Sequence, residues 1–142
     1  RINVLTFQRQ GVAVPYSFEL IKRHDLALTK RNKRRIFSAH DELGHTHSAL
    51  YLTWDGTTAY VHMVGENPAL RSSGAGILLI WEAICYASEQ LKINRFDFEG
   101  SMIEGVERVR RDCGAAQVPY FSISKTPSKW LKLFHCLSAV LR

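Results

Sequence analysis

The chain has 142 residues, of which 46% are hydrophobic, as expected for one globular domain with a core of its own. Lysine and arginine total 19 against 13 aspartate and glutamate, and the net charge of +6 favours an anionic partner: a nucleotide phosphate, a nucleic acid or a membrane surface. No apolar run approaches the roughly 18 residues needed to cross a membrane, and no secretory signal is visible, so we expect no membrane span.

The three cysteines have no C-x-x-C spacing and therefore form neither a zinc pattern nor an evident disulfide framework. We expect a reducing, cytoplasmic environment and no metal site. The first residue is Arg1 rather than a methionine, so we expect the chain to be a processed product or part of a longer protein.

At the N-terminal end, Val4–Phe7 is predicted as a short strand, followed by a loop. Arg9 and Gln10 in this loop either are solvated or line a binding site. Ser17 is of the type that caps a helix N-terminus, and the apolar spacing after it predicts a helix that ends near Lys33.

Three strands are predicted next, over Arg35–His40, Thr46–Trp54 and Thr58–Val64. Turn residues separate them, including an Asp-Gly pair typical of a hairpin, so we expect an antiparallel meander. On the third strand His62 should share a face with Val64, where a packed or hydrogen-bonded histidine is expected.

A glycine-containing junction follows the third strand and leads into an apolar helix predicted over Ala75–Leu91. The N-terminus of a helix offers unpaired N–H groups and a partial positive charge, and glycines allow an anion to approach the backbone. An arginine adds a forked cationic donor, so the junction suits a phosphate or pyrophosphate. Neither a Walker phosphate loop nor a dinucleotide G-x-G-x-x-G is present, and a plain tight turn is the alternative. The junction consists of Arg71, Ser72, Ser73, Gly74, Ala75 and Gly76.

The next strand is predicted over Arg95–Glu99, with Phe96 and Phe98 on one face. A strand, a helix and a strand in succession make a parallel pair with a right-handed crossover. Ligands of such units bind beyond the carboxyl ends of the strands, where Gly65 and Glu99 should lie together.

The remaining residues predict a capping box at Ser101–Glu104, a helix that ends at Gly114, and a last strand over Gln117–Ser124 that carries Tyr120. A final amphipathic helix is predicted from Pro127 onwards.

The order of these elements and the Arg-x-x-Gly-x-Gly junction resemble the GNAT acyltransferases. A second signal is the stretch Phe96–Met102, together with Glu107-Arg108, Arg111 and the Gly114-x4-Pro119-Tyr120 pattern after it. With Thr6–Gly11, it is similar to a bacterial, FemAB-like branch of that superfamily. Such proteins have two GNAT-like halves, and this chain resembles the C-terminal one, which implies an N-terminal half or a homodimer as partner.

The resemblance implies an α/β fold with a mixed, mostly antiparallel sheet and helices on both faces. It implies an enzyme that moves an acyl group, in the simplest case acetyl, directly from acyl-CoA to a small amine or amino-acid-like acceptor. The pyrophosphate would lie on Arg71–Gly76, and the pantetheine arm would pair beside Val64 and Gly65. Two alternatives stay open: an aminoacyl transferase that uses aminoacyl-tRNA, and a non-catalytic binding domain.

For the chemistry, Glu99 is expected either to be the base that deprotonates the amine or only to hold the turn after its strand. Tyr120 either protonates the leaving thiolate or is a buried tyrosine with a structural hydrogen bond. Arg9, Gln10 and Ser101 are expected to contact the acceptor.

Overall fold

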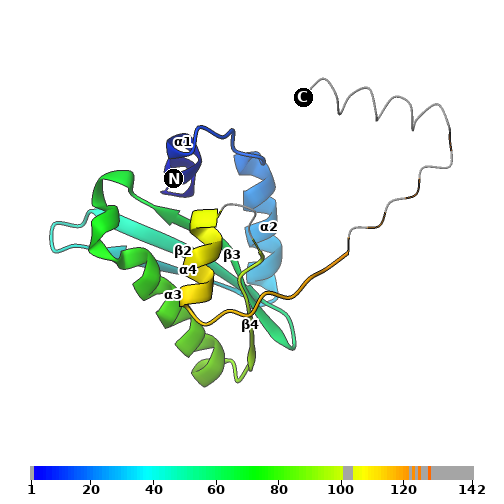
Figure 1. Ribbon diagram of the computed structural model, residues 1–142. Helices are drawn as coiled ribbons and strands as arrows, with labels where there is room; N and C mark the ends of the chain where they lie inside the picture. The colour runs from blue at the N-terminus through cyan, green and yellow to red at the C-terminus, as the bar shows by residue number, and fades with distance from the viewer. Residues whose placement is uncertain (1, 101–103, 122, 124, 126–127, 129–142) are drawn as a thin grey trace.

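The computed structural model describes residues 2–100, 104–121, 123, 125 and 128. Its strands form one sheet in the order β1-β2-β3-β4, in which the first two junctions are antiparallel and the last is parallel (Figure 1). The predicted mixed, mostly antiparallel sheet is therefore confirmed. The strands are β1 (Arg34–His40), β2 (Thr46–Trp54), β3 (Thr58–Glu66) and β4 (Arg95–Asp97).

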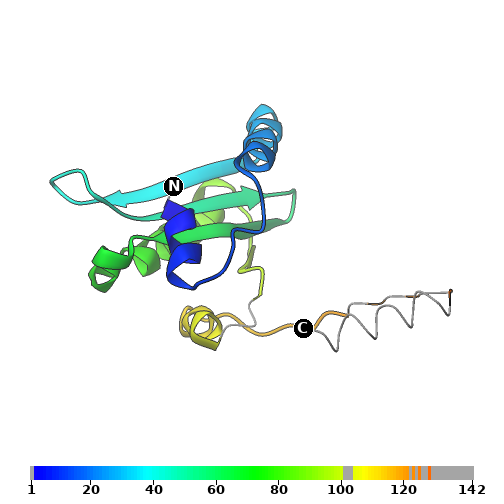
Figure 2. The same cartoon turned by 90° about the horizontal axis from the view of Figure 1, so that it is seen from above.

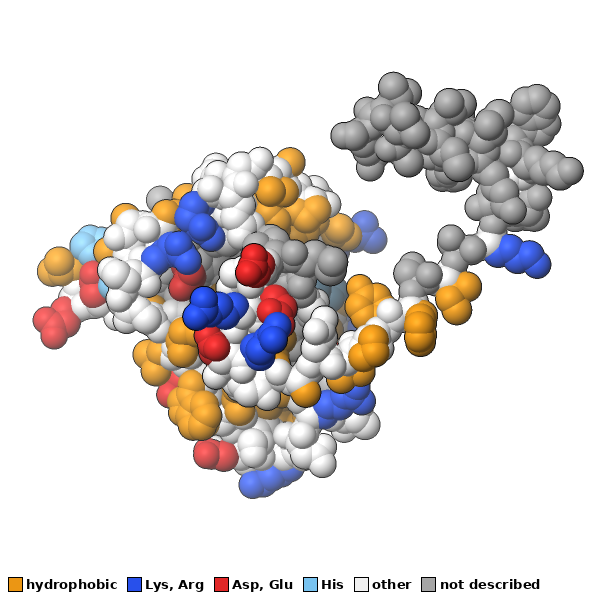
Figure 3. All heavy atoms as spheres, viewed as in Figure 1, with side chains coloured by type: hydrophobic (Ala, Val, Ile, Leu, Met, Phe, Trp, Pro, Cys, Tyr) orange, Lys and Arg blue, Asp and Glu red, His pale blue; other side chains and the backbone are white. Residues whose placement is uncertain are grey.

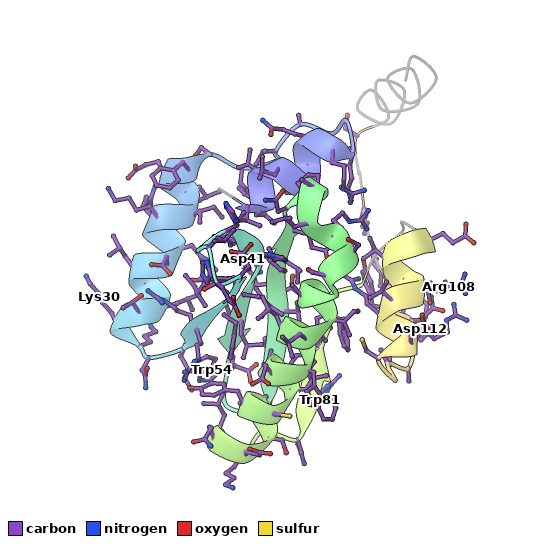
Figure 4. The ribbon with its side chains drawn as sticks, turned by 90° about the vertical axis from the view of Figure 1, so that its left-hand side faces the viewer. Lys30, Asp41, Trp54, Trp81, Arg108 and Asp112 are labelled. Carbon is purple, nitrogen blue, oxygen red and sulfur yellow. The ribbon has the colours of Figure 1, made fainter. Side chains whose placement is uncertain are left out.

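Helices cover both faces of this sheet, as expected: α2 lies on one face and α3 on the other (Figures 2 and 4). The core lies between the sheet and α3, because alternate side chains of the central strands meet the buried face of that helix. The helices are α1 (Ile2–Arg9), α2 (Phe18–Lys30), the 3-10 helix η1 (Pro68–Ser73), α3 (Ala75–Cys85), its π-helical continuation η2 (Tyr86–Gln90) and α4 (Glu104–Asp112). The fully packed cluster consists of Leu50, Leu52, Trp54, Ala59, Val61, Leu79, Ile80, Ala83 and Ala87.

The outer face of α3 is less covered than its apolar sequence predicts. Ile77 and Leu78 are about half exposed, and Trp81 is 61% exposed. The expectation of an apolar helix covered on most sides is therefore wrong for this face, although the helix itself begins at Ala75 as predicted.

The cap of α2 is where the sequence places it, but the helix ends earlier. Ser17 Oγ accepts a hydrogen bond from the Leu20 N–H at 3.2 Å, which confirms the cap. The helix stops at Lys30 because Asn32 takes a left-handed conformation (φ 53°) and turns the chain into β1.

The N-terminal segment is a helix, so the strand predicted over Val4–Phe7 is wrong. Its short apolar run does not distinguish a strand from a helix by periodicity. Tertiary contacts decide the outcome, because α1 lies across the C-terminal end of β3 and its side chains hydrogen-bond to that strand (Figures 1 and 2).

A β-bulge in β3 changes which side chains face the core. Tyr51 is paired with Met63, and Leu52 with Val61, so His62 is an extra residue on β3. Val64 consequently packs against the core on the α3 side, and the expectation that it shares a face with His62 is wrong.

The region after β4 agrees with the sequence only in part. Gly114 ends α4 with φ 85°, and the Ala115 N–H donates to Arg110 O at 3.1 Å, as in the predicted glycine cap. The strand predicted over Gln117–Ser124 is wrong for residues 117–121, which form no strand, and hydrophobic side chains lie exposed along this segment (Figure 3). The capping serine and the final helix lie outside the described residues. Within the described residues, no helix is long and apolar enough to cross a membrane.

Candidate active site

The two parallel strands pair over a short distance and then separate. Their register holds three pairs, the last of which is Tyr60 with Asp97, whereas β3 continues beside β2, without β4, as far as Glu66. The predicted parallel neighbours that diverge towards the glycine junction are therefore confirmed. The gap between the strands opens at the carboxyl ends, where a ligand of this kind of unit binds.

His62 and Glu99 face each other across this gap, with His62 Nδ1 3.2 Å from Glu99 Oε1. The bulge directs His62 to this position. Glu99 is held in a left-handed backbone conformation with φ 57°, which is uncommon for residues other than glycine. Strained backbone of this kind is often found at functional sites. The Glu99 N–H donates to Asp97 Oδ1 at 2.8 Å, so Asp97 supports the turn and the Glu99 carboxylate is directed to the histidine.

An open cavity of about 310 Å³ lies beside this pair, on the α2 face of the sheet. The His24 ring from α2 lies 5.0 Å from the His62 ring, and the Tyr51 ring lies 6.0 Å from it. Two imidazoles and a carboxylate in one hollow form a group that can accept and pass on protons. The cavity is lined by His24, Leu28, Thr53, Trp54, Asp55, Tyr60, His62 and Glu99.

The lining carries negative charge, with carboxylates at Asp55 and Glu99 and no lysine or arginine among its residues. Hydrogen bonds from the backbone N–H groups of Thr57 and Thr58, and from the Tyr60 hydroxyl, hold the pKa of Asp55 well below its usual range. Asp55 is therefore ionised at neutral pH, and the cavity offers anionic groups to a cation.

Arg110 on α4 lies near the carboxylates of Glu99 and Asp97. Burial lowers its pKa, while the charges of Glu99 and Asp97 oppose that shift. Its Nη1 is buried without a hydrogen-bond partner in the described part of the chain. Arg110 thus places a positive charge near the carboxylate of Glu99.

The glycine junction forms a compact corner between β3 and α3. Asn67 caps η1 by accepting the Ala69 N–H at 3.1 Å, and Gly74 adopts φ 72°, which links η1 to α3. Ser73 Oγ lies 3.4 Å from the Ala75 N–H, and Ser72 is exposed. A helix N-terminus with an exposed approach is consistent with the expected anion site.

Arg71 is not free at this corner, because its Nε donates to Glu66 Oε2 at 3.2 Å. The other carboxylate oxygen of Glu66 lies over Gly76, where it would collide with any added Cβ atom. The start of α3 therefore carries a carboxylate, and Arg71 is already bound to it. Sequence reasoning missed this ion pair, although the two residues are only five positions apart.

The edge of β3 beside Val64 and Gly65 is covered by α1. Asn3 Nδ2 donates to Val64 O at 3.1 Å, and the Glu66 N–H donates to Thr6 Oγ1 at 3.0 Å. Gly65 is buried, and a Cβ atom on it would lie 2.6 Å from Asn3 Cα. Gly65 is therefore required for the close approach of α1.

The other predicted site residues do not line the cavity. Arg9 is exposed at the end of α1, and Gln10 is half-buried in the turn after it. Tyr120 is 88% exposed, so the expectation of a buried tyrosine is wrong, while its role as an acid stays a prediction. Ser101 lies outside the described residues.

Sequence reasoning did not identify His24 and His62 as functional residues. Thr58 pairs with Arg95, and His62 and Glu99 each follow these residues by four positions, but this register is known only from the structure. No group of three or more His, Cys, Asp or Glu residues within the described ranges is arranged to hold a metal ion.

Comparison with known proteins identifies the fold. Residues 3–113 match the profile of a family described as acetyltransferase (GNAT) domain. The chain belongs to the GNAT acetyltransferase family. The expectation of an enzyme of this family is thereby confirmed. Among proteins with curated functions, none matches this chain significantly.

Solved GNAT structures share the fold at low sequence identity. The aminoglycoside 6'-N-acetyltransferase AAC(6')-Ig of Acinetobacter haemolyticus is 18% identical, with a TM-score of 0.60 over 86% of this chain and 90% of that chain. AAC(6')-Iy in complex with the bisubstrate analogue CoA-S-monomethyl-acetylneamine is 9% identical, with a TM-score of 0.65 over 84% and 87%. Glucosamine-6-phosphate N-acetyltransferase of Arabidopsis thaliana is 12% identical, with a TM-score of 0.60 over 90% and 91%.

Proposed function

We propose that this GNAT domain transfers an acyl group, in the simplest case acetyl, from acyl-CoA to a primary amine. The observation that carries the proposal is the His62–Glu99 pair, which lies where the parallel strands separate and beside an open cavity. A proton acceptor is required there, because an amine is mostly protonated at neutral pH and cannot attack until it loses a proton.

In the proposed reaction, the amine lies in the cavity and gives up one proton to Glu99, with His62 as its hydrogen-bonded partner. The amine nitrogen then forms a bond to the thioester carbonyl carbon, and the C–S bond breaks. The thiolate of CoA leaves and takes up the second proton that the nitrogen loses, and Glu99 releases the first proton to solvent. The thioester is already activated, so no cysteine or serine nucleophile is needed, and transfer is direct.

The charge of the cavity favours a cationic acceptor. Asp55 and Glu99 both lie in its lining, so an acceptor with a second amino group would find a carboxylate for each. An acceptor with a free carboxylate would be repelled by the same groups. The similar structure of AAC(6')-Iy, which contains the bisubstrate analogue CoA-S-monomethyl-acetylneamine, supports an amine-bearing acceptor.

The donor is proposed to place its pyrophosphate at the start of α3, on the backbone of residues 71–76. Gly74 supports this assignment, because it links η1 to α3 in a left-handed conformation and lies exposed, with open space where a Cβ atom would be. The net charge of +6 also favours an anionic donor, although it would equally favour the tRNA used by FemAB-type transferases.

The test is a thermal-melting titration with acetyl-CoA and with tRNA, followed by transfer assays on a panel of mono-, di- and polyamines. We expect acetyl-CoA to raise the melting temperature and a diamine to be acetylated faster than an amino acid of similar length. Binding of tRNA with a steep salt dependence, and none of acetyl-CoA, would favour the aminoacyl-transferase alternative. Binding of neither would favour a domain without catalytic function.

A further inference from the structure

The edge of β3 that β4 leaves unpaired is covered by α1, and the proposed function does not explain this contact. The Asn67 N–H donates to His47 O at 2.8 Å, so residue 67 directs its backbone groups towards β2. Backbone groups alternate sides along a strand, so Gly65 also faces β2, while Val64 and Glu66 face the open side. These last two residues offer the backbone groups that β4 leaves unpaired after the strands separate.

Side chains of α1 form hydrogen bonds with these backbone groups of Val64 and Glu66. Asn3 binds Val64 O, and Thr6 Oγ1 accepts the Glu66 N–H. The Tyr16 hydroxyl donates to Asn3 Oδ1, which fixes the orientation of the amide. A short helix thus forms, through two side chains, hydrogen bonds like those of an added strand.

The pantetheine arm of an acyl donor has the same chemistry, because it is an extended chain with two secondary amides. The Glu66 N–H has one hydrogen and cannot serve Thr6 and an amide of the donor together. A Cβ atom on Gly65 would also meet the backbone of Asn3, so α1 packs directly against this part of β3. Resting on the proposed function, we propose that α1 is a displaceable cover of the donor site, which acyl-CoA must move in order to bind productively.

The contacts that hold α1 on the sheet are consistent with its detachment from β3. None of its described residues is buried. Its side-chain hydrogen bonds to β3 come from Asn3 and Thr6, so the loss of these bonds should weaken its hold on the strand. Glu66 connects the cover to the phosphate corner, since its N–H binds α1 while its side chain holds Arg71.

The first test measures acetyl-CoA affinity by calorimetry in the full chain. Asn3→Ala and Thr6→Val each remove one hydrogen bond of the cover and should tighten acetyl-CoA binding roughly three- to tenfold, the usual worth of one such bond. Gln8→Ala is the matched control, because Gln8 lies exposed on the same helix, and its affinity should equal that of the unmodified chain. Adenosine 3',5'-bisphosphate, which lacks the pantetheine arm, should bind all four proteins equally.

The second test follows amide hydrogen exchange over residues 2–12. A ligand that only stabilises the fold slows exchange everywhere, whereas displacement of α1 should make acetyl-CoA speed exchange in this segment alone. Slower or unchanged exchange there, with tight acetyl-CoA binding and no gain in the Asn3 and Thr6 variants, overturns the cover but leaves the proposed function intact. Absence of acetyl-CoA binding in every variant overturns both.

Discussion

His62 Nδ1 lies 3.2 Å from Glu99 Oε1, although β3 and β4 have stopped pairing before His62 and Glu99 lies beyond the end of β4. The contact depends on the bulge that makes His62 an extra residue in β3 and on the left-handed backbone of Glu99. Each feature is costly or irregular by itself, and together they place an imidazole and a carboxylate at one point in the gap. That relationship gives the site its most direct tests.

Glu99→Gln should lower turnover roughly 10²–10⁴-fold, the usual worth of a general base, while acetyl-CoA affinity and melting temperature stay unchanged. The physical reason is that the carboxylate contacts His62, whereas Asp97 supports the turn. The loss should shrink at high pH, where the amine deprotonates unaided. Steady-state kinetics across pH, with melting curves in parallel, make the measurement.

Two control variants separate the catalytic from the structural interpretation. Asp97→Ala removes the acceptor of the Glu99 N–H and should lower the melting temperature. In the double variant His62→Gln, Glu99→Gln, the rate should fall no further than in the more damaged single variant, because the two residues act as a unit. A fall in melting temperature for Glu99→Gln alone would instead show that its carboxylate is structural.

Gly74→Asp should abolish CoA binding, and Gly74→Asn should largely preserve it. Both side chains are of the same size, and asparagine and aspartate both tolerate the left-handed conformation that Gly74 adopts, so the difference isolates the negative charge. Calorimetry with CoA decides the matter. Equal affinity in the two variants would place the pyrophosphate elsewhere.

Arg71→Ala and Glu66→Gln should change CoA affinity in opposite directions. The arginine variant loses a charge-assisted hydrogen bond and should weaken binding by about 1–3 kcal/mol. The glutamine variant removes the carboxylate that holds Arg71 at 3.2 Å and should strengthen binding. Calorimetry at low and moderate salt provides the comparison, and weaker binding by Glu66→Gln would show that the carboxylate positions Arg71 for the ligand.

The elements with strong local signals could be predicted, and those that depend on distant contacts could not. β2 and the starts of β3 and α3 agree with the expected bounds, because alternation, the Asp-Gly turn and the glycine junction are local features. The N-terminal segment is not predictable in this way, since its helix is held to a strand about 60 residues away: Asn3 donates to Val64 O, and Thr6 accepts from the Glu66 N–H.

The site shows the same division. Glu99 could be placed at the carboxyl end of its strand from the strand order alone. His62 was expected to be a packed or hydrogen-bonded histidine, because a bulge leaves no mark in the sequence and strand register comes from pairing across the sheet. The Glu66–Arg71 ion pair likewise depends on how β3 turns into η1.

Tyr51 provides a test of pH dependence on the α2 face. Burial, together with the hydrogen bond that its hydroxyl donates to Asp25 Oδ1 at 3.0 Å, raises its pKa to about 12. An acid whose pKa is raised in the folded state contributes stability that is complete below its ordinary pKa of about 10 and is lost as the pH rises towards 12. Tyr51→Phe should therefore lower the melting temperature at pH 8, and the gap to the unmodified chain should narrow between pH 10 and pH 11. Tyr120→Phe, at an exposed position, should match the unmodified chain throughout. A gap for Tyr51→Phe that stays constant with pH would show that the hydroxyl contributes through packing and not through its bond to Asp25.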